Sequence, residues 1–245
     1  YPMLSVIDPT SDTSDLRSVI IHEIGHNWFY GALGSNERDH PWLDEGLNSY
    51  YERTGLGSLL EPTENVLLSH LYQERKDQPI NTSSERFTNM NYAAIAYLKT
   101  AQWMELMEKT LGKPKFDQAM QDYFQRWKFK HPAPSDLLST FQAHSQADLS
   151  HYFQLLDKSG PLQPAPARGW KWQLINGWND KDPYPTKNRI TLLPIAGYNQ
   201  ADGLMTGLAV TNLKLPLNDL QWLAIPLYAT RSKHINGIGF INHRW

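Results

Sequence analysis

The sequence predicts an α+β protein in which a mainly helical part is followed by a β-rich part. Up to residue 158, apolar residues recur at helical spacing, and Gly or Pro marks the ends of successive helices. After residue 188, short apolar runs alternate with Asn, Asp, Gly and Lys, which is typical of strands joined by turns. Five prolines fall in 159–187, and proline interrupts helices and strands alike. We therefore expect a helical domain over 1–158, a Pro-rich linker over 159–187 and an antiparallel β segment over 188–245.

The individual elements follow from local signals. Ser, Thr and Asp side chains before the first apolar repeat can cap a helix, and Pro fits the first turn of several others. The polar stretch 77–89 is predicted to be a loop. Helices are predicted over about 16–30, 42–53, 62–76, 92–111, 114–127, 135–144 and 149–158, and strands over 189–195, 204–213, 220–230 and 235–242.

Composition excludes several classes of partner and site. Lys and Arg number 23 against 25 for Asp and Glu, so no net charge favours nucleic acid, and we expect no nucleic-acid partner. The absence of cysteine means that a metal site must use His, Asp and Glu. No apolar stretch approaches the roughly 20 residues of a membrane helix. The chain begins without Met, and we expect it to be a piece of a longer protein.

One short motif predicts a metal site. In His22-Glu23-Ile24-Gly25-His26, the two histidines lie one helical turn apart and project from the same face. Glu23 lies beside both, which is the minimal geometry for a zinc-bound water with a carboxylate next to it. A helix that carries two histidines by chance is the alternative, so a third ligand is needed.

The third ligand lies downstream, in Pro41-Trp42-Leu43-Asp44-Glu45-Gly46, where eighteen residues separate His26 from Glu45. This spacing and the Asp-Glu-Gly context resemble the gluzincin zinc aminopeptidases, the family of aminopeptidase N and the leukotriene-hydrolysing enzyme. The resemblance implies a thermolysin-like domain with zinc bound by His22, His26 and Glu45, and a peptide substrate. Two imidazoles and one carboxylate leave zinc an open position, which suits hydrolysis, and Glu23 can act as general base and then acid.

The resemblance continues in Tyr97-Leu98-Lys99-Thr100, which matches a Y-x-K-G segment of the family except for Thr100. By this resemblance the Tyr97 hydroxyl stabilises the oxyanion of the reaction. A buried core tyrosine is the alternative interpretation, and Tyr92 is the competing residue. Asp44 stands where the family more often has Asn, and it is expected either to hold a histidine ring or to be a helix N-terminal charge.

The resemblance extends over about 1–158 and is strongest over 18–52. Family members recognise the substrate amine through a Gly-x-Met-Glu-type strand, and Tyr1-Pro2-Met3-Leu4 looks like the continuation after that strand. The acidic residue that selects a free amine is therefore expected to precede this chain. An endopeptidase of the thermolysin type and an epoxide hydrolase on the same site stay open as alternatives. A non-catalytic binding or membrane-associated module with a vestigial metal site is the alternative of another class.

The β segment carries a different signal. Residues 195–208 combine Gly with alternating apolar residues and are similar to strands of bacterial outer-membrane barrels. Membrane association and an extracytoplasmic location of the longer protein are therefore expectations, with a soluble β appendage as the equal alternative. The oligomeric state and the preferred substrate side chain do not follow from the sequence.

Overall fold

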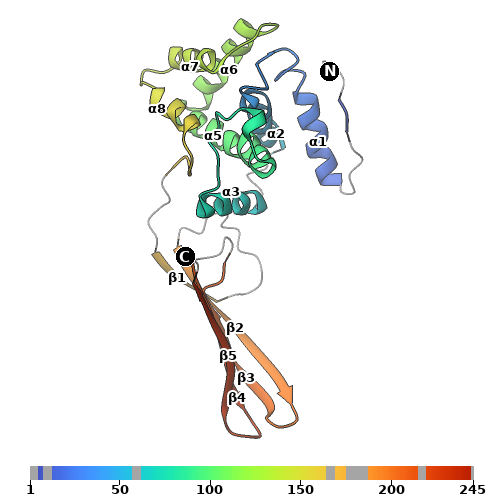
Figure 1. Ribbon diagram of the computed structural model, residues 1–245, viewed down its shortest axis with the longest axis vertical. Helices are drawn as coiled ribbons and strands as arrows, with labels where there is room; N and C mark the ends of the chain where they lie inside the picture. The colour runs from blue at the N-terminus through green and yellow to red at the C-terminus, as the bar shows by residue number, and fades with distance from the viewer. Residues whose placement is uncertain are drawn as a thin grey trace. The chain divides into compact units, whose positions relative to one another are not determined.

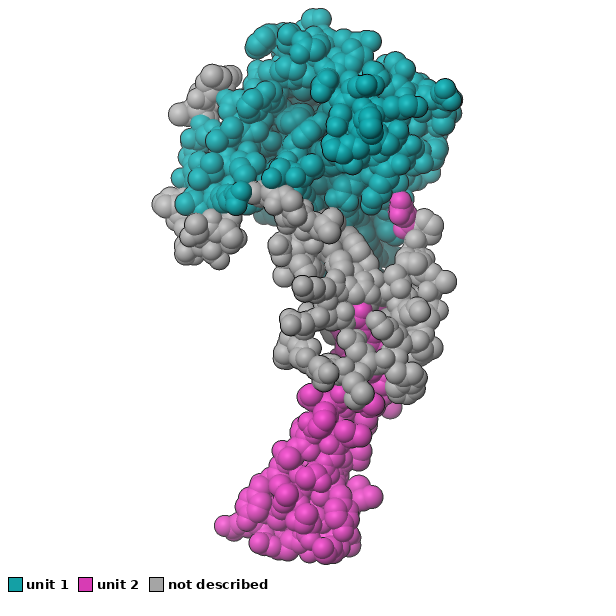
Figure 2. Space-filling model, turned by 180° about the vertical axis from the view of Figure 1, so that it is seen from behind, with its two compact units in different colours: residues 1–162 teal, residues 163–245 magenta. Residues whose placement is uncertain are grey.

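The computed structural model describes residues 5–7, 13–56, 62–163, 169–174, 187–214 and 219–243. The chain divides into two compact units, Tyr1–Leu162 and Gln163–Trp245, which are coloured separately in Figure 2. Helices form the described part of unit 1, and strands form that of unit 2 (Figure 1). The predicted mixture of helices and sheet is therefore confirmed.

The helices of unit 1 pack around an aromatic core. Trp42 and Trp103 are fully buried with ring centroids 5.7 Å apart, and Phe153 meets Trp103 at 4.9 Å. Truncating a buried aromatic side chain of this kind typically costs about 3–5 kcal/mol, so these rings hold the helices together. The helices are α1 (Thr13–Gly25), η1 (Trp42–Gly46), α2 (Leu47–Leu56), α3 (Pro62–Glu74), η2 (Ser84–Arg86), α4 (Asn89–Asn91), η3 (Tyr92–Lys99), α5 (Thr100–Leu111), α6 (Lys113–Trp127), α7 (Pro134–Ala143), α8 (Ser150–Phe153) and η4 (Gln154–Asp157).

Two predicted helices differ in their first turns, because η1 and η3 are π-helices rather than α-helices. The wider π-helical turn is clear at the end of η3, where the Thr100 backbone N–H donates to the Ile95 carbonyl oxygen five residues earlier. The Thr100 hydroxyl donates to the same carbonyl at 3.0 Å, which reinforces the wider turn. Short π-helical segments occur frequently at functional sites.

A buried lysine anchors η3 to the rest of unit 1. Lys99 is fully buried, and its Nζ lies 3.3 Å from Asp77 Oδ2 and 3.3 Å from the backbone oxygen of Lys158. The backbone N–H of Gly160 donates to the same oxygen of Asp77 at 2.6 Å. Lys99 therefore links the predicted loop, through Asp77, to the end of unit 1, through Lys158.

Unit 2 is a five-stranded sheet in the order β1-β2-β3-β4-β5. Its strands are β1 (Gly169–Leu174), β2 (Lys187–Asn199), β3 (Gly203–Thr211), β4 (Leu220–Ala229) and β5 (Ile235–His243). Strands β2 to β5 pair antiparallel, as predicted, and a tight turn at Gly203, with φ of 72°, joins β2 to β3.

Strand β1 corrects the sequence prediction, because it lies inside the predicted linker 159–187 and pairs parallel with β2. The segment has the strand alternation of apolar Trp170, Trp172 and Leu174 with polar residues. The prolines on both sides obscured this signal. Strands β3 to β5 extend over nearly the same residues as predicted, whereas β2 extends beyond the predicted 189–195 at both ends.

In the described part of the chain, no helix is both long and apolar enough to cross a membrane. Residues 1–4, on which the expectation of a preceding substrate-binding strand rested, lie outside the described residues.

Candidate metal centre

His22, in α1, and His26, in the turn directly after this helix ends at Gly25, lie together, as the four-residue spacing predicts. Their ring centroids lie 4.8 Å apart in an edge arrangement. Glu45, from η1, reaches both rings: its Oε2 lies 3.1 Å from His22 Nε2 and 3.4 Å from His26 Nε2. Side chains from α1, from the turn after it and from η1 thus converge on one point.

The geometry of these three donors suits zinc. Their ligand atoms all lie within 4.8 Å of one another, and no other group of this kind occurs in the part of the chain that the structure describes. A tetrahedral zinc ion with bonds of about 2.0–2.1 Å holds its ligand atoms about 3.3–3.4 Å apart. The distances of 3.1 and 3.4 Å from Glu45 to the two histidines are close to this value.

Each histidine is oriented by a second carboxylate on its other nitrogen. His22 Nδ1 lies 3.0 Å from Glu52 Oε2, and His26 Nδ1 lies 2.8 Å from Asp44 Oδ1. Ser18 donates a hydrogen bond from its hydroxyl to Glu52. Such partners fix the ring tautomer so that Nε2 is free to bind a metal.

Of these two carboxylates, the sequence indicated Asp44 as one of two alternatives and missed Glu52. The signal for Glu52 was its position seven residues after Glu45, which is two helical turns on the same face.

Without a metal, the histidines and carboxylates of the cluster shift one another's pKa values. Burial favours the neutral ring of His22, but hydrogen bonds to Glu45 and Glu52 outweigh it and raise its pKa to about 9. Burial likewise opposes the charge of His26, yet Asp44 and Glu45 raise its pKa to about 10. Burial disfavours the charge of Glu45 too, but the two histidines lower its pKa to about 2.

Asp44 behaves differently, because burial prevails over His26 and raises its pKa to about 6. A bound metal needs neutral imidazoles, so metal binding must release protons from this cluster.

Tyr97 lies at the same point. Its ring stacks on that of His22 with centroids 5.6 Å apart, and its hydroxyl hydrogen-bonds to Glu45. Burial and the charge of Glu45 raise the pKa of Tyr97 far above its ordinary value, so the hydroxyl keeps its proton. Tyr92, the competing residue, touches the ring of Tyr97 edge-on at 5.9 Å, one layer further from the histidines.

Close packing of η1 against η3 brings Glu45 and Tyr97 together. A Cβ atom added at Gly46 would lie 2.2 Å from Thr100 Cγ2 and 2.6 Å from the Ala96 backbone oxygen. Only glycine allows this approach. Thr100, the departure from the family pattern, therefore contacts the glycine that follows Glu45.

A similar contact holds α1 on α2. The Asn48 side-chain amide donates to the His22 carbonyl oxygen at 2.7 Å. A Cβ atom at Gly25 would lie 1.9 Å from Asn48 Oδ1. Gly25 therefore makes room for the side chain that supports the first histidine.

Glu23 lies on α1 between the two histidines and is half-buried. The Ser5 hydroxyl donates to its backbone oxygen at 3.3 Å. Among the residues that the structure describes, no hydrogen bond or ion pair engages its carboxylate.

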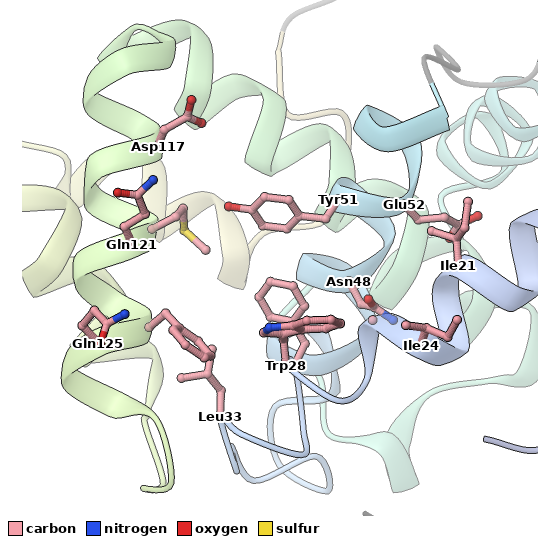
Figure 3. Close-up of a pocket in the computed structure, with 14 residues that line it drawn as sticks. Ile21, Ile24, Trp28, Leu33, Asn48, Tyr51, Glu52, Asp117, Gln121 and Gln125 are labelled. Carbon is pink, nitrogen blue, oxygen red and sulfur yellow. The ribbon is translucent and has the colours of Figure 1, made fainter. Parts of the chain in front are cut away.

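A pocket of about 690 Å³ lies on another face of α1. Asp117, Gln121 and Gln125 of α6 line one wall, and Tyr51 of α2 faces them across it (Figure 3). Glu52 lines this pocket and also contacts His22 through its carboxylate.

Comparisons with known proteins identify the family of the chain. The sequence model of the peptidase family M1 domain matches residues 4–155. The chain belongs to peptidase family M1. The resemblance of this M1 chain to the gluzincin aminopeptidases is thereby confirmed.

Similar curated proteins are glutamyl aminopeptidase of Mus musculus and leucine aminopeptidase 2 of Chaetomium globosum. The first is 23% identical over 82% of this M1 chain and 24% of its own length, and the second is 23% identical over 76% and 35%. The chain thus spans about a quarter of the length of the glutamyl aminopeptidases that it matches. The M1 zinc metallopeptidase of Deinococcus radiodurans aligns at 19% identity with a TM-score of 0.47, over 61% of this chain and 35% of that one.

Proposed function

We propose that this M1 chain is the catalytic part of a zinc-dependent peptidase. The observation that carries the proposal is the meeting of His22 Nε2, His26 Nε2 and Glu45 Oε2 at distances that suit one zinc ion. We assign the catalytic domain to residues 1–158 and propose for it the thermolysin-like arrangement of the family. The extent of the family match over 4–155 supports this boundary.

In this proposal, His22, His26 and Glu45 hold the zinc, which when bound lowers the pKa of a water molecule and polarises the substrate carbonyl. Glu23 takes a proton from the attacking water and passes it to the departing amine. Its position on α1 between the two histidines supports this role, as does the lack of a hydrogen bond or ion pair to its carboxylate among the described residues. Asp44 and Glu52 hold the two rings in orientation and do not touch the substrate.

Tyr97 is proposed to donate its hydroxyl to the oxygen of the attacked carbonyl as negative charge develops there. A donor must keep its proton until it is needed, and the raised pKa of Tyr97 meets this requirement. In the absence of substrate, Glu45 accepts the hydrogen bond.

Peptides with a free amino terminus are the proposed substrates, because the curated relatives are named aminopeptidases. Those names differ in the preferred residue, glutamyl in one case and leucine in the other. We therefore propose no preference for a particular side chain.

The test compares the unchanged chain with a Glu23→Gln variant. We expect both to contain one zinc by elemental analysis, and the variant to hydrolyse aminoacyl amides about 100- to 10,000-fold more slowly, the typical contribution of a general base. His70 is an exposed residue of α3, so His70→Gln is the control and should leave turnover unchanged.

The substrate panel separates the alternatives. Cleavage of free-amine substrates in preference to blocked ones supports an aminopeptidase, and the reverse preference supports an endopeptidase. A chain that binds no zinc and turns over neither kind would contradict the proposal and indicate a non-catalytic module.

A further inference from the structure

The sheet of unit 2 presents one face without charged side chains. Neighbours along a strand point to opposite faces, and residues paired across strands share a face. The pairs Pro194–Leu208, Thr206–Tyr228 and Trp222–Ile241 therefore define one face across β2 to β5. We call it the uncharged face: alternate residues of 190–198, 204–210, 220–228 and 235–241, starting at each first number.

The polar side chains of the uncharged face are few and of one kind. Apart from Thr206, those within these bounds are aromatic residues with one polar atom, namely Tyr198, Tyr228 and Trp222, and His243 lies just beyond them as the partner of Leu220. The opposite face carries polar residues towards the ends of its strands, namely Arg189, Thr191, Asn199, Thr211, Gln221, Asn236 and Asn242, and apolar residues such as Leu193, Ile225 and Phe240 between them. Leu204, Leu208 and Ile241 of the uncharged face are exposed, although large exposed apolar patches are uncommon on soluble proteins.

The dimensions of this face match those of a bilayer. Strand β3 has nine residues, which extend about 30 Å at 3.4 Å per residue, and a hydrocarbon core is about 30 Å thick. Tyr228 and Trp222 are six residues apart on β4, or about 20 Å. Apolar bands of about 25 Å between two levels of aromatic side chains are typical of sheets in membranes.

Charges lie where such a band would end. Asp202 occupies the turn between β2 and β3, and Arg231 and Lys233 occupy the turn between β4 and β5. These two turns lie together, since the Arg231 N–H donates to the Asp202 backbone oxygen at 2.8 Å. Lys214 and Asp219 lie at the opposite end of the strands.

We propose that the uncharged face contacts the acyl chains of a lipid bilayer. The face has no charged side chain between its two aromatic levels, and charges lie beyond each level, as expected of a band that meets acyl chains. In the described sheet, β5 pairs with a strand on one edge alone. Because acyl chains offer no hydrogen bonds, its other edge must pair with a further strand or a second copy in the bilayer.

The test uses the whole chain and vesicles of phosphatidylcholine, a neutral lipid that limits attraction to the charged turns. We expect the unchanged chain to float with the vesicles in a density gradient. Leu208→Arg, in the middle of the uncharged face, should weaken partition about 30-fold or more, because arginine at the bilayer centre costs about 2–4 kcal/mol.

Two matched variants serve as controls. Leu193→Arg lies next to this level on the opposite face and is equally exposed, at 45% against 44% for Leu208. Leu204→Arg lies on the uncharged face near its end, where arginine costs about 0–1 kcal/mol. Both should change partition less than fivefold, and far-ultraviolet circular dichroism establishes that each variant is folded.

Three outcomes would overturn the proposal. The unchanged chain could stay in the buffer fraction. The three variants could weaken flotation equally, which would indicate apolar association without a preferred face. Sedimentation could show a stable dimer that does not bind vesicles, which would assign the face to a second copy.

Discussion

The side chain of Tyr97 is oriented by two neighbours, His22 and Glu45. Its ring stacks on His22, and its hydroxyl bonds to Glu45. Among the aromatic residues of η3, its ring is the one that packs on a histidine, while Tyr92 packs on Tyr97.

This arrangement predicts different effects for two tyrosine variants. Tyr97→Phe should lower kcat about 100- to 1,000-fold, the usual effect of removing one oxyanion donor, with KM and zinc content nearly unchanged. Tyr92→Phe should change kcat less than threefold. Steady-state kinetics on an aminoacyl amide measures both, and equal losses in the two variants would refute the assignment.

Glu52 contacts the metal-site histidine His22, a role that the sequence did not reveal. It accepts a hydrogen bond from Ser18 and holds His22 Nδ1 at 3.0 Å. Replacing such a partner typically lowers metal affinity about 10- to 100-fold.

We therefore expect Glu52→Leu to weaken zinc binding by about 10- to 100-fold, measured by competition with a chelating indicator. Glu52→Gln should lie between it and the unchanged chain, since an amide oxygen can still accept from the ring. Glu105→Leu, half-buried on α5, is the control and should retain full affinity. A normal affinity for Glu52→Leu would show that His22 needs no such partner.

At the scale of elements, the site depends on how closely η1 approaches η3. Gly46 lies against Thr100 and the backbone of Ala96, so that even a methyl group would overlap both. Gly55, in α2, has no atom within 4 Å of the position where a Cβ would be.

Gly46→Ala should destabilise unit 1 by about 1–3 kcal/mol through overpacking and should lower turnover by separating Glu45 from Tyr97. Gly55→Ala should instead stabilise it by up to about 1 kcal/mol, because alanine is the better helix former. Urea unfolding at equal zinc loading compares the two. Similar midpoints for both variants would mean that the helices can move apart freely.

Across the whole molecule, local patterns were sufficient for most elements and for the centre of the site. The apolar spacing located the helices, and the positions of His22, His26 and Glu45 predicted the cluster that the structure brings together. Both depend on short-range periodicity, which the sequence displays directly.

What the sequence could not display depends on contacts between distant segments. The π-helical turns of η1 and η3 lie where Gly46 packs against Thr100 and where the Thr100 hydroxyl donates to the Ile95 carbonyl oxygen. Strand β1 was missed because its short alternation lies between prolines and its partner β2 pairs with it in parallel. The pocket beside α1 combines residues of α1, α2 and α6, so no single stretch of sequence indicates it.

The buried ammonium of Lys99 determines where the helical unit can end. An amine that is removed from water needs nearby oxygens to solvate it, and one of the two oxygens at 3.3 Å from Lys99 Nζ is the carbonyl oxygen of Lys158. A second, Asp77, is itself held by the Gly160 N–H. A chain shortened before Gly160 would thus lose part of the solvation shell of this cation, two residues from Tyr97. The end of unit 1 therefore helps to hold the helix that carries Tyr97, although it lies more than sixty residues beyond Tyr97 in sequence.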